Sequence, residues 1–218
     1  MAVIPTVIEH TYAGERVSDI YSRLLAARIV MLGTEITPDT ANLIVAQLLH
    51  LEAESTSKDV QLYINSPGGD MVAMFAIHDA MQSIRCDVAT TCIGHSAAAA
   101  AILLAAGTRG KRRTLPNARV LLHQPHGGAQ GQSSDLEIAV KEMVEMRRRM
   151  IGILAECTGQ SLERITADID RDYILRDEAA VRYGVVDHVL QPAGRGRTPL
   201  PSTEDVLQPA APQPALTG

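Results

Sequence analysis

Aromatic residues are scarce in this 218-residue sequence, which contains no tryptophan, one phenylalanine and five tyrosines. Its hydrophobic core must therefore be packed from aliphatic side chains and methionine. Long hydrophobic runs are also absent, because no apolar stretch approaches the roughly 20 residues that a membrane-spanning helix requires. The first residues lack a basic start followed by an apolar stretch, so we expect no secretory signal peptide.

Cysteine and positive charge are equally limited. Three cysteines, Cys86, Cys92 and Cys157, are too few and too odd in number for a disulfide framework, and they suit a reducing compartment such as the cytoplasm. No cysteine–histidine pair has the spacing of a zinc site. Acidic residues outnumber basic ones, 25 to 20, and the net charge of −5 argues against a nucleic-acid-binding surface.

What is present is the composition of a globular protein, with 46% hydrophobic and 21% charged residues. Prolines concentrate near the C-terminus, where residues 191–218 hold six of the eleven. Such a segment cannot bury a core, and we predict that it forms a disordered tail. We predict one folded domain over residues 17–190, preceded by a flexible N-terminal segment over residues 1–16.

Short apolar runs alternate with helical patterns along the domain, which predicts an α/β fold with a mostly parallel, buried sheet. Thr37 and Pro38 mark the start of one helix, whose buried face would include Leu43 and Ile44. Gly159 ends the longest helix. The predicted strands are 28–33, 60–65, 87–94, 119–123 and 185–190, and the predicted helices include 71–83, 96–106, 133–158, 162–169 and 178–183.

Two loops could carry chemistry. Gly68 and Gly69 follow a strand, and paired glycines let backbone N–H groups point at an anion or an oxyanion. An ordinary strand-to-helix turn would explain the same residues. In residues 94–98 a strand runs into the loop and a helix runs out, which is the context of a nucleophile elbow with Ser96 as nucleophile, or simply of Ser96 capping the helix.

Two side chains elsewhere are candidates for proton transfer. His123 ends an apolar strand, where a histidine can serve as a general base or be structural. Asp172 lies in a short acidic run that could equally be a solvated turn. The arginine run at residues 147–149 is typical of a solvated helix face or a salt-bridged interface.

These residues together resemble the ClpP family, the proteolytic subunit of the ATP-dependent Clp protease. The resemblance covers about residues 13–190. It rests on specific blocks of sequence, which are GER at 14–16, DIYSRLL at 19–25, ANLIVAQLL at 41–49, YINSPGG at 63–69, LPNAR at 115–119, HQP at 123–125, GGAQGQ at 127–132 and YGVVD at 183–187.

The resemblance implies a crotonase-like fold, which is a spiral of β-β-α units with a protruding handle helix from Ser133. It implies two stacked heptameric rings, a tetradecamer that encloses a degradation chamber. The implied activity is serine endopeptidase cleavage of unfolded polypeptide delivered by an AAA+ unfoldase. It implies no metal, no cofactor, no nucleic acid and no membrane.

The family uses a Ser-His-Asp triad, whose histidine and aspartate correspond to His123 and Asp172. The nucleophilic serine stands four residues after a glycine, and the fourth residue after Gly94 is Ala98. A methyl group cannot attack a carbonyl, so we expect this chain to be catalytically inactive. The resemblance assigns the oxyanion donors to the backbone N–H groups of Gly69 and Ala99.

Three explanations of Ala98 remain open. It can be a deliberate Ser→Ala substitution made to trap substrate or block self-processing. It can belong to a natural inactive subunit that assembles with an active paralogue. It can also accompany a rewired triad of Ser96, Asp172 and His188, although two residues along a helix rotate a side chain by roughly 200° and so would turn Ser96 away from the site.

Three further groups of residues take roles from the resemblance. Gly127, Gly128 and Ala129 would line the substrate path as a strand to which the polypeptide adds. Asp170 and Arg171 would form ion pairs between the rings. An apolar pocket for an unfoldase loop would be lined by Tyr63, Ile93, Leu115 and Leu190. The pocket would also contain three polar residues, Gln61, Ser83 and Arg113. These polar residues predict weak docking of the unfoldase unless a paralogous subunit supplies the main docking face.

Overall fold

The computed structural model of the chain describes residues 4–11, 14–125 and 130–191. These residues form strands and helices that alternate along most of the domain, as predicted. The strands are β1 (Thr6–Thr11), β2 (Gly14–Asp19), β3 (Ile29–Leu32), β4 (Val60–Ser66), β5 (Val88–Ala97), β6 (Arg113–Thr114), β7 (Arg119–Leu122), β8 (Tyr173–Arg176) and β9 (His188–Val189). The helices are α1 (Ile20–Ala26), α2 (Pro38–Glu54), α3 (Met71–Ser83), α4 (Ala99–Ala105), α5 (Ser133–Thr158), α6 (Leu162–Asp168) and α7 (Asp177–Tyr183).

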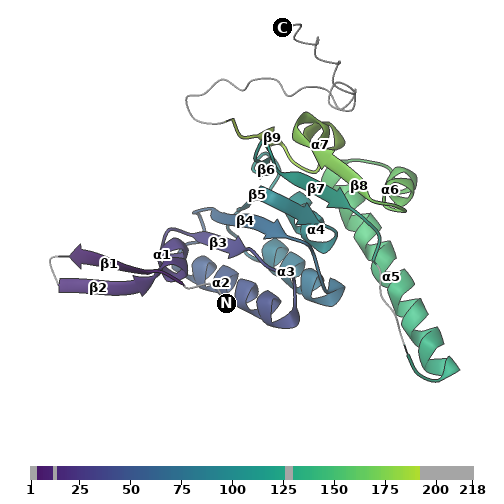
Figure 1. The fold of residues 1–218 in the computed structure, drawn as a ribbon, viewed down its shortest axis with the longest axis horizontal. Helices are drawn as coiled ribbons and strands as arrows, with labels where there is room; N and C mark the ends of the chain where they lie inside the picture. Colours follow the sequence, from purple (N-terminus) through teal and green to yellow (C-terminus); the bar gives the residue numbers. More distant parts are fainter. Residues whose placement is uncertain (1–3, 12–13, 126–129, 192–218) are drawn as a thin grey trace, which may run out of the picture.

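The main sheet is mostly parallel, in agreement with the prediction. Its strands lie in the order β3-β4-β5-β6-β9, and β7 pairs with the far end of β5. Only the β7–β8 pair is antiparallel within this described sheet. The β1–β2 hairpin stands apart from the sheet, and the long α5 projects away from it at the opposite end of the molecule (Figure 1).

Several predicted boundaries agree with the structure because a local signal fixes them. Thr37 caps α2 by accepting a hydrogen bond from the Thr40 N–H, and Pro38 occupies the first turn. Helix α5 ends at Gly159 in the left-handed conformation. The predicted bounds of α3 and α5 are those observed.

The start of α4 was predicted wrongly. The predicted helix began at Ser96, but β5 continues to Ala97 and α4 begins at Ala99. The reason is a parallel ladder with β7, in which Ser96 and Ala97 face Val120 and Leu121. Strand pairing at the far end of β5 therefore outweighs the helix-capping preference of a serine.

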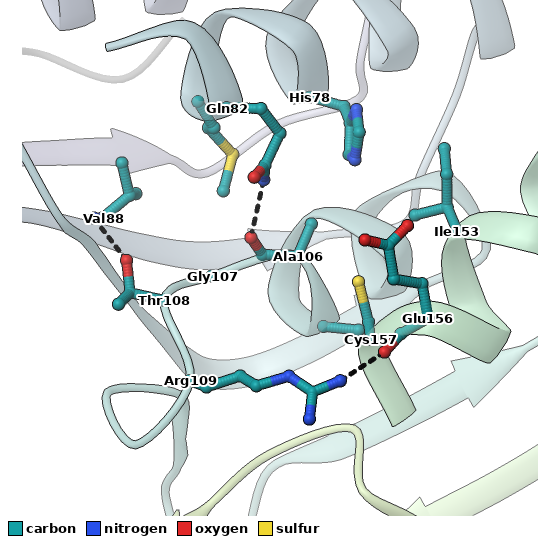
Figure 2. A pocket seen from close by; sticks show the side chains of 12 residues that line it. His78, Gln82, Val88, Ala106, Gly107, Thr108, Arg109, Ile153, Glu156 and Cys157 are labelled. Carbon is teal, nitrogen blue, oxygen red and sulfur yellow. Dashed lines mark hydrogen bonds between the residues drawn. The ribbon is translucent and has the colours of Figure 1, made fainter. Parts of the chain in front are cut away.

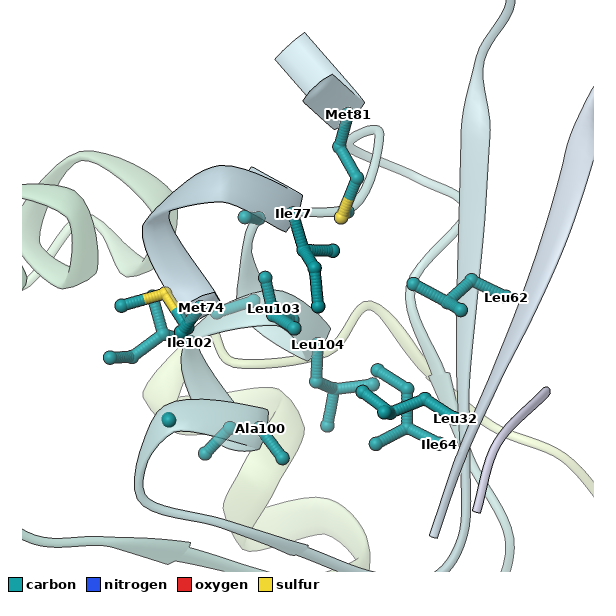
Figure 3. Close-up of a cluster of buried hydrophobic side chains, with 14 of the residues drawn as sticks. Leu32, Leu62, Ile64, Met74, Ile77, Met81, Ala100, Ile102, Leu103 and Leu104 are labelled. Carbon is teal, nitrogen blue, oxygen red and sulfur yellow. The ribbon is translucent and has the colours of Figure 1, made fainter. Parts of the chain in front are cut away.

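The core is aliphatic, as the shortage of aromatic residues required. Helix α4 lies between α3 and the sheet, with Leu103 and Leu104 packed among Met74, Ile77 and Leu62 (Figure 3). All seven residues of α4 are buried. Leu43, which was predicted to lie on the buried face of α2, is 64% exposed, because Ala41 and Ile44 turn toward the core instead.

A buried arginine ties the ends of two helices to the last strand. Arg112 donates to the carbonyl oxygens of Ala105, at the end of α4, and Cys157, near the end of α5. Its guanidinium also binds both carboxylate oxygens of Asp187. These contacts fix α4, which carries one side of the candidate site, relative to α5.

Five elements were not predicted, namely β1, β2, β6, β8 and α1. The β1–β2 hairpin overlaps the segment that we expected to be flexible, and β6 and β8 have two and four residues, too few for a clear hydrophobic pattern. Helix α1 has no buried residue to mark it.

Among the described helices, none has the length and hydrophobicity needed to cross a membrane. The predicted disordered tail lies outside the described residues apart from Gln191.

Candidate active site

Ala98 occupies a sharp junction between β5 and α4. Its backbone has φ 46° and ψ −114°, a conformation that a residue with a side chain rarely adopts. The Ala98 N–H donates to the Leu121 carbonyl at 2.8 Å, which anchors the junction to β7. The result is a strand–turn–helix elbow with the β-carbon of Ala98 at its apex.

The glycine loop after β4 packs directly against this elbow. Gly68 has φ 94°, and a β-carbon there would lie 2.6 Å from the Ala97 oxygen and 3.3 Å from the Ala98 β-carbon. Gly69 has φ 146°, and its β-carbon would overlap the Ile36 carbonyl oxygen. The loop is therefore more than an ordinary turn, because only glycine lets it approach the elbow and the Ile36 backbone so closely.

Two backbone donors of these segments face one cavity. Gly69 and Ala99 both line an open cavity of about 500 Å³, together with Ala98 and His123. In the part of the chain that the structure describes, neither the Gly69 N–H nor the Ala99 N–H donates a hydrogen bond to another group. Such uncommitted N–H pairs are what an oxyanion requires.

The register of β7 and β8 brings His123 and Asp172 together. Leu122 pairs with Tyr173 in the antiparallel ladder, so the residue after Leu122 and the residue before Tyr173 lie opposite each other. The His123 Nε2 atom is 3.8 Å from Asp172 Oδ1, which is an ion-pair distance but too long for a hydrogen bond. The Asp172 side chain is 67% exposed and that of His123 is 27% exposed.

Gln124 holds this part of the site through three hydrogen bonds. Its N–H donates to the Ile169 oxygen at 2.9 Å, and its Nε2 donates to the Asp170 oxygen at 3.3 Å. Its Oε1 accepts from Arg147 Nε on α5 at 3.1 Å. Gln124 thus joins the strand end that carries His123, the loop that leads to Asp172, and the long helix.

Ser96 is not available as a substitute nucleophile. Its residue is fully buried, and its hydroxyl has no hydrogen-bond partner among the described residues. The predicted alternative that Ser96 caps α4 is also wrong, since Ala98 holds the capping position and no side chain caps the helix there. The strand geometry, rather than the helical rotation that we expected, turns Ser96 away from the cavity.

The cysteines offer no alternative nucleophile either. Burial raises the pKa of the Cys92 thiol to about 11 and raises the pKa of the Cys157 thiol. The thiolate is the reactive form, so both thiols are protonated near neutral pH. Cys157 lies beside a second cavity of about 340 Å³ between α3 and α5, where Gln82 and Arg109 donate to backbone carbonyl groups (Figure 2).

The structure brings together Ala98, Ala99, Gly69 and His123 in one cavity lining, with Asp172 beside His123. Sequence reasoning missed three further residues of this lining, namely Glu35, Asp70 and Met71. Glu35 lies in the loop before α2 and could not be placed there from spacing alone. Asp70 follows the glycine loop directly and could have been found from that motif.

The other predicted residues lie outside this cavity or outside the described residues. Gly127, Gly128 and Ala129 belong to the segment 126–129, which the structure does not describe. Arg171 Nε lies 3.9 Å from Asp170 Oδ2, and the two side chains are 94% and 67% exposed.

The residues assigned to unfoldase docking lie on neighbouring strands. Tyr63 is on β4 and Ile93 is on β5, and Leu115 and Leu190 follow β6 and β9. The Leu115 N–H donates to the Cys92 oxygen and the Leu190 N–H to the Thr114 oxygen, which places the strand ends side by side. The residues therefore lie on adjacent strands or directly after them, although Tyr63 pairs with Thr91 and so lies two residues before the level of Ile93.

A comparison with known protein families gives one match that covers this region of the chain. A sequence model of the Clp protease family matches residues 12–193. The match includes the whole of the predicted domain, residues 17–190, and every position of the candidate site.

Proposed function

Because this chain belongs to the Clp protease family, we propose that it is a subunit of a ring protease that has kept the peptide-binding machinery of the active site but has no nucleophile of its own. Family membership makes it a Clp-type proteolytic subunit of the serine peptidase class, with the mostly parallel α/β fold described above. Family membership also implies a ring-forming oligomer that works with Clp ATPases. The heptameric double ring and the AAA+ unfoldase are part of the proposal.

One observation carries the proposal. The Gly69 and Ala99 N–H groups and the His123 imidazole surround a single cavity, and the atom that should react there is the methyl group of Ala98. A peptide carbonyl bound to the two N–H groups would have its carbon next to position 98. The arrangement fits acyl transfer in every component except the attacking oxygen.

The same geometry describes how an active counterpart would work. A serine hydroxyl at position 98 would attack the peptide carbonyl carbon while His123 takes the hydroxyl proton. Collapse of the tetrahedral intermediate would break the C–N bond, and His123 would return the proton to the leaving amine. Asp172 would orient the imidazole and stabilise its cation, and water would then release the acyl group by the same steps.

The proposed inactivity follows from the chemistry of the available groups. A methyl group has no lone pair and no acidic proton, and the hydroxyl of Ser96 is buried. The chain would therefore bind a peptide without cleaving it. Whether Ala98 is an engineered or a natural residue is decided by the codon at that position in the source genome.

Reversion of Ala98→Ser tests this proposal. We expect the correctly assembled variant to cleave short fluorogenic peptides and to react with a serine-directed fluorophosphonate at position 98, whereas the unchanged chain does neither. Loss of a triad nucleophile typically costs about a millionfold in rate, so the difference should be unmistakable. Assembled rings of the variant that neither cleave nor react would overturn the triad assignment, and labelling of the unchanged chain at Ser96 would support the rewired alternative.

We also propose that ring assembly and triad geometry are coupled through Asp170 and Arg171. Both residues directly precede Asp172, and their exposed side chains would be available for ion pairs with a subunit of the opposite ring. Helix α5 projects from the domain (Figure 1). Its side chains Ile138, Val140 and Val144 are exposed. The substitution Arg171→Ala should yield single rings and, after reversion of Ala98, low peptidase activity, whereas intact double rings with full activity would contradict the coupling.

A second candidate function is that of a structural or regulatory subunit in a mixed ring. Three of the positions that the resemblance assigns to unfoldase docking are polar in this chain, namely Gln61, Ser83 and Arg113, which favours weak unfoldase binding by this subunit alone. We propose that a paralogous subunit carries the main docking face. A pull-down of an AAA+ unfoldase by the homo-oligomer decides the matter, because tight ATP-dependent capture without a paralogue would contradict the mixed ring.

A further inference from the structure

The strand that leads into the elbow, β5, is irregular shortly before its end. Ile64 of β4 pairs with Cys92 of β5. The next pair is Ser66 with Ser96, so β4 advances by two residues while β5 advances by four. Residues 93–95 therefore form a bulge that has no register partner on β4, and bulges of this kind re-aim side chains and weaken the pairing around them.

Strand β7 holds β5 on the other side of the bulge. The ladder between them begins with the pair of His95 and Arg119 and continues for two further pairs. At its end the Ala98 N–H donates to the Leu121 oxygen at 2.8 Å. Strand β7 then leads to His123, two residues after Leu121. This short ladder therefore spaces position 98 from the His123 imidazole.

A side-chain hydrogen bond joins the first pair of this ladder. Arg119 Nε donates to His95 Nδ1 at 3.1 Å, and both residues are half-buried. A guanidinium has donors only, so Nδ1 is the unprotonated nitrogen and the imidazole is neutral in this arrangement. The His95 backbone N–H donates in turn to Asn65 Oδ1 at 3.2 Å. His95 thus connects the bulge to β7 through its side chain and to β4 through its backbone.

The strands around this pair carry no negative charge. Strands β4 to β8 contain no aspartate or glutamate, and their charged residues are Arg113, Arg119 and Arg176. Arg176 pairs with Arg119 across β7 and β8. Arg113 of β6 pairs with Thr91, before the bulge. Burial of the imidazole and the Arg119 charge lower the pKa of His95. Protonated His95 would lose its hydrogen bond and stand beside a cation, with no carboxylate of these strands to offset the repulsion.

We propose that His95 and Arg119 clamp the end of β5 to β7 and so position the candidate active site, and that this clamp holds only while the His95 imidazole is neutral. Both are positioning residues, since neither is among the described residues that line the cavity. The effect on catalysis rests on the proposed function. The effect on the ladder does not, because the hydrogen bond is present in the chain with Ala98.

The direction of the pH dependence follows from the lowered pKa of His95. A histidine released from the clamp titrates near pH 6.5, whereas the clamped residue titrates below that value. The clamp therefore stabilises the ladder fully above pH 6.5 and is lost as the pH falls through the lower pKa. Loss of a hydrogen bond from a charged donor should raise the population of the open ladder about tenfold.

Hydrogen exchange tests the clamp in the chain as it exists. Exchange of the Ala98 amide, which donates to β7, is measured by mass spectrometry of overlapping peptides at about pH 5 and about pH 7.5, either side of the usual histidine pKa. After correction for the intrinsic effect of pH, we expect exchange to be about tenfold faster at the lower pH. His95→Asn keeps an acceptor near the position of Nδ1 but cannot be protonated, so it should abolish the difference. The control His50→Asn changes an exposed histidine of α2 and should retain the difference.

Kinetics in the Ala98→Ser background test the positioning role. His95→Leu leaves Arg119 Nε without its acceptor at every pH, and a less precisely held position 98 should lower kcat about fivefold with a smaller change in KM. His123 titrates in the same pH range, so the acid limb is read from a comparison of variants. At about pH 5, His95→Asn should retain a larger fraction of its kcat at neutral pH than the Ala98→Ser parent retains.

The possible results separate the clamp from the proposed function. Equal corrected exchange at both pH values in the unchanged chain, or a pH difference that persists in His95→Asn, would overturn the clamp. A kcat in His95→Leu equal to that of its parent would overturn the positioning role. An Ala98→Ser variant that cleaves nothing at any pH would refute the proposed function instead, and the exchange result would then decide the clamp alone.

Discussion

Gly69 and Ala99 belong to segments that the protein core holds in place, whereas His123 and Asp172 stand at the edge of the sheet near α5. On the first side, a bridge to Ile36, a ladder to β7 and a fully buried α4 leave the backbone little freedom. On the second side, the ion pair is 3.8 Å long and one of its members is two-thirds exposed.

The contrast indicates which part of the site a single chain can determine. The oxyanion side depends on close contacts within the domain, so it should be formed in an isolated subunit. The His123–Asp172 side depends on Gln124 and on a loop with exposed charges, so contact with another subunit can change it. If the proposed ring forms, its assembly would act on the His123–Asp172 pair and leave the backbone of the oxyanion side unchanged.

The largest expected effect comes from Gly69→Ala, which changes the oxyanion side of the site. The added β-carbon would overlap the Ile36 carbonyl oxygen and lie 2.8 Å from the Ile36 nitrogen, at a positive φ that alanine disfavours. We expect a loss of about 3 kcal/mol or more in the free energy of unfolding. Urea denaturation followed by circular dichroism measures it.

A glycine with open space provides the control for that change. Gly152 lies within α5 and has no atom near the position of an added β-carbon. Gly152→Ala should keep or slightly raise stability, because alanine has the better helix propensity. If both variants unfolded at the same urea concentration, the close packing of the glycine loop would not be what stabilises this side of the site.

Substitutions near the His123–Asp172 pair should lower the catalytic rate rather than the stability of the protein. In the Ala98→Ser background, Gln124→Ala removes both side-chain contacts of Gln124, to the Asp170 oxygen and to Arg147. We expect kcat to fall about tenfold with a smaller change in KM, because both lost contacts position the His123–Asp172 pair, whereas Gln124 is only one of several residues that line the cavity. Steady-state kinetics on assembled rings gives both constants.

A conservative variant separates the two contacts. Glutamate at position 124 can still accept from Arg147, but it cannot donate to the Asp170 oxygen. Gln124→Glu should therefore resemble Gln124→Ala if the loop contact matters, and should resemble the parent if the contact with α5 matters. A kcat equal to that of the parent in both variants would contradict the positioning role.

The sequence predicted the elements with strong local signals and missed those that tertiary pairing creates. Thr37, Pro38 and Gly159 marked helix ends correctly, because capping and proline geometry are local effects. The start of α4 could not be predicted from Ser96, since the ladder between β5 and β7 joins residues that are distant in sequence. The short strands β6 and β8 are defined by their partners alone.

The candidate site divides in the same way. The roles of His123, Asp172 and position 98 were predicted from the resemblance to the ClpP family, and the structure places His123 at the cavity with Ala98 and beside Asp172. Glu35 and Gln124 could not be assigned from the sequence. Glu35 lines the cavity because the Ile36–Gly69 bridge holds the neighbouring backbone against the glycine loop. Gln124 contacts α5 and the loop before β8.

A smaller effect should come from the elbow itself. Ala98 adopts a backbone conformation that glycine tolerates better than alanine. Ala98→Gly should therefore raise the free energy of unfolding by about 1.5 kcal/mol, after allowing for the greater freedom of glycine in the unfolded chain. A lower thermal unfolding midpoint would show that the methyl contacts at the elbow outweigh the strain.

The smallest change concerns the hydroxyl group that lies two residues from the elbow. Ser96 is fully buried, and its oxygen has no hydrogen-bond partner among the described residues, so folding removes it from water without replacing the lost bond. Ser96→Ala should therefore stabilise the protein by about 1 kcal/mol or slightly less. Differential scanning calorimetry should show an unfolding midpoint higher by a few degrees, and after Ala98→Ser the peptidase activity should be unaffected, because the hydroxyl does not reach the cavity. A lower midpoint would mean that the hydroxyl has a partner in the assembled protein.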